Sequence, residues 1–402
     1  MSYCRISAIG MVNALGSGVS AILPRLLAGD RSGVHPISGF LSEGTARLGV
    51  ALIPRPNVPK ELFHLGSRNT QLLVASFAQI AGEVTEAIAR YGAGRVAVVI
   101  GSSTSGIPQG EYAIAAREQG RELPDDYLYS QQEMGAPAEV VSILSGALGP
   151  AYCISTACSS SAKVFRAGRE FIASGVCDAV IVGGADCLCC MTVQGFGSLE
   201  LLSNEPTNPF SKNRSGINIG EGATLLLLTK DPGGVQILGV GEASDAYHIS
   251  SPHPEGKGAI TAMQLALRNA GVSPSDVSYL NLHGTGTLHN DAMEARAVAA
   301  VFGDHVASLA CSSTKPLVGH MLGASGATEV AFCAMALEQR NASGELPLPP
   351  HIFDGEYDSE LPRLRLVDWG ETLRVSGTCI MMSNSFGFGG SNCSVVLGAQ
   401  AF

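Results

Sequence analysis

The sequence is poor in charged side chains and has no long apolar run. Only 15% of its 402 residues are charged, and 25 lysines and arginines face 35 aspartates and glutamates, for a net charge of −10. A nucleic-acid-binding protein normally presents a basic face, so this balance argues against that class. The best apolar run, at 223–230, is far too short to cross a membrane. We therefore expect neither nucleic acid nor membrane among the partners.

A secretory signal is also missing from the N-terminus, because "MSYCRISAIG" has neither a basic start nor a long apolar stretch. We expect a cytoplasmic protein whose eleven cysteines are reduced and mostly buried. In "DCLCC", Cys187, Cys189 and Cys190 lack a second ligand pair at the spacing of zinc sites. The sequence therefore favours packing for these thiols and predicts no metal site.

Short apolar runs alternate with helical patterns along the chain, and the hydrophobic share of 46% is enough for a large core. Runs of this length are typical of strands buried on both faces. We expect such strands at 5–11, 95–101, 151–155, 179–184 and 224–229. Helical patterns lie between them, among others at 69–92 and 135–148.

The order of elements begins again after the turn-like "DPGG" at 231–234. Four pairs of segments correspond: 5–16 with 235–246, 96–106 with 277–287, 151–158 with 309–315, and 178–186 with 377–390. This repeat predicts an α/β protein of two similar halves, 1–232 and 233–402, packed together. The proline-rich, charged stretch at 341–370 is predicted to be irregular surface chain.

Polar residues gather in the loops after the predicted strands, and such loops meet at one end of the sheets. Cys158 lies where the strand at 151–155 turns into a helix, and free helix N–H groups would lower its pKa. The loops of the second half hold further candidates: His283, Lys315, His320, Phe386 and Phe388. A single cysteine or histidine is more often structural, so the combination indicates a nucleophile with partners.

Four motifs carry a resemblance to a known family: "TACSSS", "HGTGT", "TKPLVGHMLGASGATE" and "NSFGFGGSN". In this order they resemble the β-ketoacyl-ACP synthases of the elongating (I/II) type, in the thiolase superfamily. The resemblance implies a thiolase-like fold of two βαβαβαββ-type halves in five αβαβα layers. It also implies an acyltransferase that condenses a cysteine-bound acyl chain with malonyl-ACP and releases CO2. No cofactor is implied beyond the phosphopantetheine of the acyl carrier protein.

The resemblance further implies a role for each site residue. Cys158 would take the acyl chain, and its backbone N–H and that of Phe388, which would also act as a gate, would form an oxyanion hole. His283 and His320 would stabilise the enolate formed from malonyl-ACP. The remaining roles are electrostatic organisation by Lys315, support by Asp291 and Glu329, and substrate binding by Thr285, Thr287 and Phe386.

Several positions depart from the family pattern. Ser211, Ser215 and Leu288 stand where aspartates and a proline are usual, and Glu200 stands where many members place a basic residue for the acidic carrier. The remaining candidates for carrier docking are Lys212, Arg214 and Arg68. These departures indicate a specialised synthase, and "HNDAMEARAV" is similar to synthases of aryl-polyene pathways. The sequence leaves the pathway open between fatty acid synthesis and polyketide or aryl-polyene synthesis.

Two other functions are compatible with the fold. A degradative thiolase would need a second reactive cysteine in the last glycine-rich loop, but Cys393 lies beyond that loop. A non-catalytic chain-length-factor-like subunit would lack the nucleophile that Cys158 provides. The resemblance implies a homodimer, or a heterodimer with such a homologous subunit. The polar segment 129–140 is then either the end of an acyl tunnel closed by the partner or a solvated loop.

Overall fold

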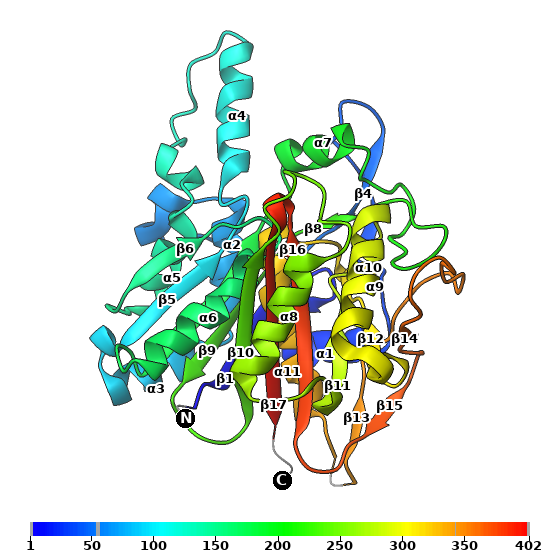
Figure 1. Ribbon diagram of the computed structural model, residues 1–402. Coiled ribbons are helices and arrows are strands. Elements are labelled where there is room, and N and C mark those ends of the chain that lie inside the picture. Colours follow the sequence, from blue (N-terminus) through cyan, green and yellow to red (C-terminus); the bar gives the residue numbers. More distant parts are fainter. Residues whose placement is uncertain (1–2, 54–56, 342, 400–402) are drawn as a thin grey trace.

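The computed structural model describes residues 3–53, 57–341 and 343–399, and strands from both halves of the chain form its framework (Figure 1). Their order is β14-β12-β11-β16-β17-β10-β1-β9-β7-β5-β6. The first half supplies β1 (Arg5–Asn13), β5 (Val96–Gly101), β6 (Ala151–Ile154), β7 (Ala179–Asp186) and β9 (Gly222–Thr229). The second half supplies β10 (Val235–Ser244), β11 (Val277–Asn281), β12 (Ala310–Ser312), β16 (Cys379–Gly387) and β17 (Ser391–Ala399).

The two halves repeat the same strand order and the same pairing sense. β5 is parallel to β6 and β7, as β11 is to β12 and β16. The two remaining strands of each half, β9 and β1 or β17 and β10, run antiparallel to their neighbours in the sheet. The halves meet at β1 and β10, where a single residue pair, Arg5 with Gln236, is in register. The two sheets are therefore held together mainly by side-chain packing rather than by the hydrogen-bond ladder.

The fold has five layers, α-β-α-β-α. One apolar cluster surrounds the central helices, and two further clusters lie between the sheets and the outer helices. Along β5, Val98 and Ile100 face an outer cluster, whereas Val99 points to the central one, because strand side chains alternate. The outer helices on that sheet are α2 (Arg68–Phe77), α3 (Ala81–Tyr91) and α5 (Ala136–Ser145). The central helices are α6 (Ser160–Ala173) and α11 (Ser325–Glu338), and α8 (Lys257–Ala270) and α9 (Leu288–Phe302) cover the other sheet. This arrangement matches the predicted fold class.

The central helices approach each other closely. A Cβ atom on Gly326 of α11 would come within 2.7 Å of the backbone N of Ala162 in α6. The Ser161 Oγ also accepts a hydrogen bond of 2.9 Å from the Ala327 N–H. These contacts fix the start of α11 against the start of α6, where the candidate site residues gather.

Smaller elements complete the fold. They are α1 (Val19–Leu27), α4 (Ile107–Glu118), α7 (Cys190–Ser198), α10 (Lys315–Val318), β2 (Gly16–Ser17), β3 (Val34–Ser38), β4 (Thr45–Gly49), β8 (Ile219–Gly220), β13 (Glu345–Pro347), β14 (Arg365–Leu366) and β15 (Thr372–Arg374), with short 3₁₀ turns between them. In Figure 1, α4 extends away from the sheets. The N–H groups of Cys190 and Met191, at the start of α7, donate to the Glu111 carboxylate of α4.

The helical pattern at 69–92 is two helices, α2 and α3, bent by 70°. At the bend, the Gln79 amide pairs with β1: its Oε1 accepts from Met11 N at 2.9 Å and its Nε2 donates to Met11 O at 3.1 Å. The backbone at the bend forms tight turns instead of continuing the helix, with Gln79 N donating to Ser76 O and Ile80 N to Phe77 O. Among the described residues no single helix has the length and composition of a membrane span, and α2 with α3 meets that test only as a bent pair.

Two further expectations need correction. β6 was expected to be buried on both faces, but it is the edge strand and Tyr152 is 40% exposed. The described part of the stretch 341–370, which leaves out residue 342, is largely irregular, as predicted, but it is not wholly at the surface. His351 and Leu364 are buried because this segment packs against the strands and helices of the second half to which it belongs. The boundary predicted at 232 falls in the connection between β9 and β10.

Candidate active site

Cys158 lies in a sharp turn between β6 and α6. Ala157 has a φ of 53°, a left-handed conformation that is uncommon for a residue with a side chain. The Ala157 carbonyl accepts hydrogen bonds from the N–H and the hydroxyl of Ser160, at 3.1 and 2.6 Å, which hold the turn. Cys158 is 5% exposed and lies just before Ser159, the N-cap of α6.

The Cys158 thiol is protonated in the resting site, contrary to the sequence prediction of a lowered pKa. Burial raises the pKa to about 11, although the Lys315 ammonium and the backbone N–H groups of Phe388 and Cys158 act to lower it. Loss of water around the sulfur outweighs these favourable interactions, of which only the Cys158 N–H belongs to the turn that leads into α6. The sulfur therefore depends on neighbouring groups to become a nucleophile.

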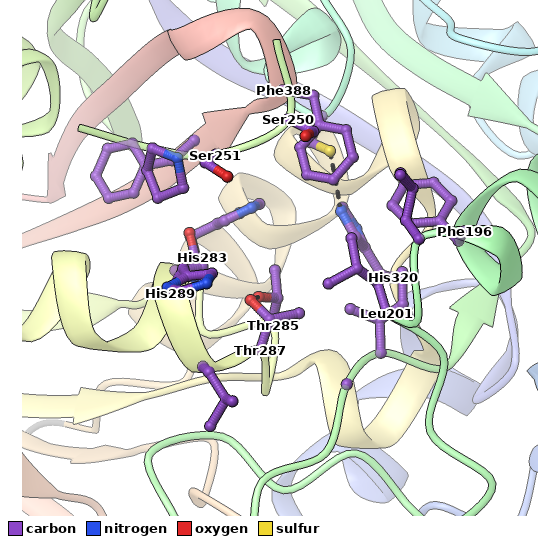
Figure 2. Close-up of a pocket in the computed structure, with 18 of the residues that line it drawn as sticks. Phe196, Leu201, Ser250, Ser251, His283, Thr285, Thr287, His289, His320 and Phe388 are labelled. Carbon is purple, nitrogen blue, oxygen red and sulfur yellow. Dashed lines mark hydrogen bonds between the residues drawn. The ribbon is translucent and has the colours of Figure 1, made fainter. Parts of the chain in front are cut away.

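His320 and His283 are the nearest such groups. The His320 Nε2 lies 3.1 Å from the Cys158 Sγ, as the dashed line in Figure 2 marks. The two imidazole rings are 5.4 Å apart, centre to centre, and nearly perpendicular. Burial, followed by the charge of Lys315, lowers the pKa of both histidines well below the usual value. Both imidazoles are therefore neutral near pH 7.

Lys315 fixes the tautomer of His283. Its Nζ lies 3.3 Å from His283 Nδ1 and 2.6 Å from Glu329 Oε1. An ammonium group only donates hydrogen bonds, so Nδ1 of His283 accepts and its proton is on Nε2. Because that nitrogen belongs to a cavity-lining side chain, His283 presents an N–H donor to the site.

Two buried carboxylates hold the loop that carries His283. Asp291 accepts from the N–H groups of Gly286 and Phe210, at 3.2 and 2.9 Å, which is consistent with its expected supporting position. Glu294, which sequence reasoning missed, accepts from His283 N and Gly284 N at 2.8 and 2.7 Å. The sequence signal would have been an acid one helical turn after Asp291 on α9.

A cavity of about 400 Å³ opens above Cys158. The predicted residues in its wall are Cys158, His283, Thr285, Thr287, His320, Phe386 and Phe388. The wall also includes side chains that were not predicted, among them Phe196, Leu201, Ser250, Ser251 and His289 (Figure 2). The centres of the Phe388 and Phe196 rings are 5.3 Å apart, and the hydroxyl oxygens of Thr285 and Thr287 are 3.0 Å apart. The wall thus combines apolar surface with a few hydroxyl and imidazole groups.

The segment 129–140 does not line this cavity. The side chain of Gln131 is buried, but its amide bonds within its own turn, accepting from Leu128 N at 3.1 Å and donating to Asp126 O at 2.9 Å. Its polarity therefore serves local structure in this single chain.

Cys158, His283 and His320 are side chains of the types that bind metal ions. Among the described residues the only group of three metal-type ligands is Cys158, His283 and His320, with ligand atoms within 4.8 Å of one another. However, the Nε2 of His283 carries a proton, and the Lys315 ammonium lies beside its ring. This donor set does not suit a cation.

The charged candidates for carrier docking are engaged within the chain. Arg68 pairs with Glu221, Lys212 with Glu356 and Arg214 with Asp358, at 2.5, 2.6 and 2.6 Å. Ser211, one of the family departures, donates to the Asp354 carboxylate at 3.1 Å, so a carboxylate comes to that place from another segment. Ser215 pairs with the Ser203 hydroxyl at 2.8 Å, and exposed Glu200 and Leu288 line the cavity mouth.

Comparisons with known proteins agree with this geometry. The chain matches the model of the β-ketoacyl synthase N-terminal domain over 56–232 and that of the C-terminal domain over 235–348. It is 32% identical to the 3-oxoacyl-acyl-carrier-protein synthase 2 of Coxiella burnetii (strain RSA 493 / Nine Mile phase I), over 98% of this chain and 97% of that protein. With the synthase 2 of Rhizobium meliloti (strain 1021) the identity is 29%, over 98% and 97%.

Two solved structures extend the comparison. A chain of the complex between a ketosynthase (ApeO) and its chain length factor (ApeC) from Xenorhabdus doucetiae is 44% identical, with a TM-score of 0.92 over 99% of this chain and 98% of that one. The ishigamide ketosynthase/chain length factor is 27% identical, with a TM-score of 0.86 over 99% of each chain. This protein belongs to the β-ketoacyl synthase family and has its thiolase-like fold.

Proposed function

We propose that this β-ketoacyl synthase joins an acyl chain held on Cys158 to a malonyl unit held on an acyl carrier protein. One observation carries the proposal: the Cys158 Sγ lies 3.1 Å from a neutral imidazole, with a second neutral imidazole beside it, in the wall of an open cavity. The names of the curated relatives, 3-oxoacyl-acyl-carrier-protein synthases, support the same reaction.

In the first half-reaction the sulfur of Cys158 attacks the thioester carbonyl of an acyl carrier. Its thiol proton ends on the departing phosphopantetheine sulfur, and the acyl chain stays on the enzyme. The backbone N–H groups of Cys158 and Phe388 face this sulfur and stabilise the transient oxyanion. Thr285 and Thr287, with their hydroxyls in the cavity wall, contact the pantetheine arm.

In the second half-reaction the malonyl thioester loses CO2. The electron pair of the broken C–C bond passes into an enolate, whose oxygen accepts hydrogen bonds from the imidazoles of His283 and His320. The enolate carbon attacks the acyl carbonyl on Cys158, the Cys158 thiolate leaves, and a 3-oxoacyl carrier is released. No metal or organic cofactor takes part, since loss of CO2 drives the new C–C bond.

We also propose that β6 pairs with the same strand of a homologous subunit. β6 is an edge strand with no neighbour on its outer side within the described ranges, and exposed Tyr152 lies on it. The similar ketosynthases solved with a chain length factor support a heterodimer and a specialised pathway of the aryl-polyene kind.

Mass spectrometry of the intact protein tests the function. Incubation with an acyl carrier is expected to add the mass of the acyl group, and malonyl carrier should then remove it. Cys158→Ala should show no mass gain, whereas Cys153→Ala, a substitution of the half-buried cysteine on β6, should retain it. An acylated Cys158→Ala protein would contradict the assignment, and a wild-type chain that never gains mass would favour a non-catalytic subunit.

A further inference from the structure

We infer that the Ser325 hydroxyl is a positioning group that fixes the tautomer of His320. The Ser325 Oγ lies 3.0 Å from His320 Nδ1, on the ring side away from Cys158, and is 1% exposed. His320 itself is held on both sides of its backbone, because its N–H donates to Asn218 O at 2.7 Å and its carbonyl accepts from Gly220 N at 2.9 Å. The ring is thus clamped between a hydroxyl and the sulfur. This inference rests on the proposed condensation.

The hydrogen-bond count decides which way the hydroxyl points. Within the described ranges His320 Nδ1 is the single partner of Ser325 Oγ. If Nδ1 carried the ring proton, the buried Ser325 hydroxyl hydrogen would have no acceptor. If the hydroxyl instead donates to Nδ1, the ring proton is on Nε2 and points at the Cys158 sulfur. Only a thiol S–H, a weak donor, is then left without a partner, so the second arrangement is favoured.

This tautomer is the one that the second half-reaction needs. Once Cys158 is acylated, its sulfur has no proton to give, and an Nε2–H on His320 can turn to the enolate oxygen. Lys315 sets the same tautomer on His283. Two different groups, a lysine and a serine, therefore give both imidazoles the same role as donors toward the cavity.

Nitrogen-15 NMR of histidine-labelled protein tests the inference directly, because the ring nitrogens of the two tautomers have different shifts. In the wild type we expect His320 with a bare Nδ1 and a protonated Nε2. In Ser325→Ala we expect a mixture of both tautomers, and Ser325→Thr, which keeps the hydroxyl, should restore the wild-type pattern. A wild-type His320 protonated on Nδ1 would overturn the inference even if every serine variant failed to fold.

Kinetics give the second readout. Ser325→Ala should lower malonyl-carrier decarboxylation about tenfold, which is less than the loss expected from deleting a whole oxyanion donor. Self-acylation should change less than about threefold, because the enolate charge that the imidazoles stabilise does not arise in that step. Ser142→Ala removes a half-buried hydroxyl on the remote helix α5 and should leave both rates unchanged. Equal losses in both half-reactions would indicate a merely structural serine, whereas a wild type that does not decarboxylate would refute the proposed function instead.

Discussion

Lys315 and Glu329 form an ion pair of 2.6 Å in which both side chains are almost completely buried, with exposures of 1% and 3%. Removing one partner of such a pair leaves a charge without compensation in the interior. We expect Glu329→Gln to lower the free energy of unfolding by about 3 kcal/mol in a urea titration. The exposed pair between Arg166 and Glu170 gives a matched control, since Glu170→Gln should change stability little. A Glu329→Gln protein as stable as wild type would contradict the expectation.

The two histidines should affect the two half-reactions unequally. His283→Ala or His320→Ala should lower malonyl decarboxylation by about 10²–10³, because the enolate charge appears only in that step. Self-acylation of Cys158 should fall much less, and His64→Ala, which changes a remote and exposed histidine, should alter neither rate. Rapid-quench assays of each half-reaction measure both. Equal losses in the two steps would mean that the histidines act by positioning Cys158.

Stability at acid pH should depend on His351. Burial lowers its pKa from 6.5 to about 4, and its ring accepts from Ser313 N at 3.1 Å and bonds Pro209 O at 3.0 Å. The folded chain therefore binds fewer protons than the unfolded chain in this range, so stability is complete above about pH 6.5 and is lost as the pH falls toward 4. The loss amounts to roughly 3 kcal/mol at most.

Urea titrations between pH 7 and 4.5 check this dependence. His351→Asn, which keeps an acceptor for the Ser313 N–H, should be less stable at pH 7 and should show a flatter dependence on pH. The buried His283 and His320 contribute in the same direction, so the difference between variant and wild type is the informative quantity. Parallel pH curves for both proteins would exclude His351 as the source.

Glu200 should oppose an acidic carrier protein at the cavity mouth. Glu200→Arg is expected to raise kcat/KM for such a carrier several-fold at low salt, and the gain should vanish in 0.5 M NaCl, because screening removes interactions between exposed charges. Glu86→Arg, an exposed change on α3, is the charge-matched control. A fall in kcat/KM for Glu200→Arg would show instead that Glu200 pairs with a cation on the carrier.

The sequence predicted the parts of the site that follow strands. Continuous apolar runs located β5, β7 and β9, and the loops after strands contained Cys158, His283 and His320, which the structure brings together. These features are local in sequence, because a strand end and its loop are neighbours along the chain.

Features that depend on distant contacts could not be predicted in this way. At the bend between α2 and α3, the Gln79 side chain pairs with Met11, 68 residues away, and such a contact is not visible in the local sequence. Glu294 and Ser325 lie within the quoted motifs "HNDAMEARAV" and "TKPLVGHMLGASGATE", but their hydrogen bonds to the backbone of His283 and to the ring of His320 depend on how α9 and α11 pack against the site loops. The pKa of Cys158 was predicted with the wrong sign, because the helix N-terminus is visible in the sequence while the extent of burial is not.

The close packing of α6 on α11 has a consequence for synthesis of the chain. Val164 and Phe165 of α6 are fully buried in the cluster to which α11 contributes. The last buried residue of α11 is Leu337, so a ribosome completes the first 232 residues well before it has made the whole of α11. At 5–20 residues per second, the nascent chain carries this apolar face uncovered for roughly 5–20 s. The ribosome therefore releases an active enzyme only if the first half does not aggregate before α11 has been synthesised and can pack against α6.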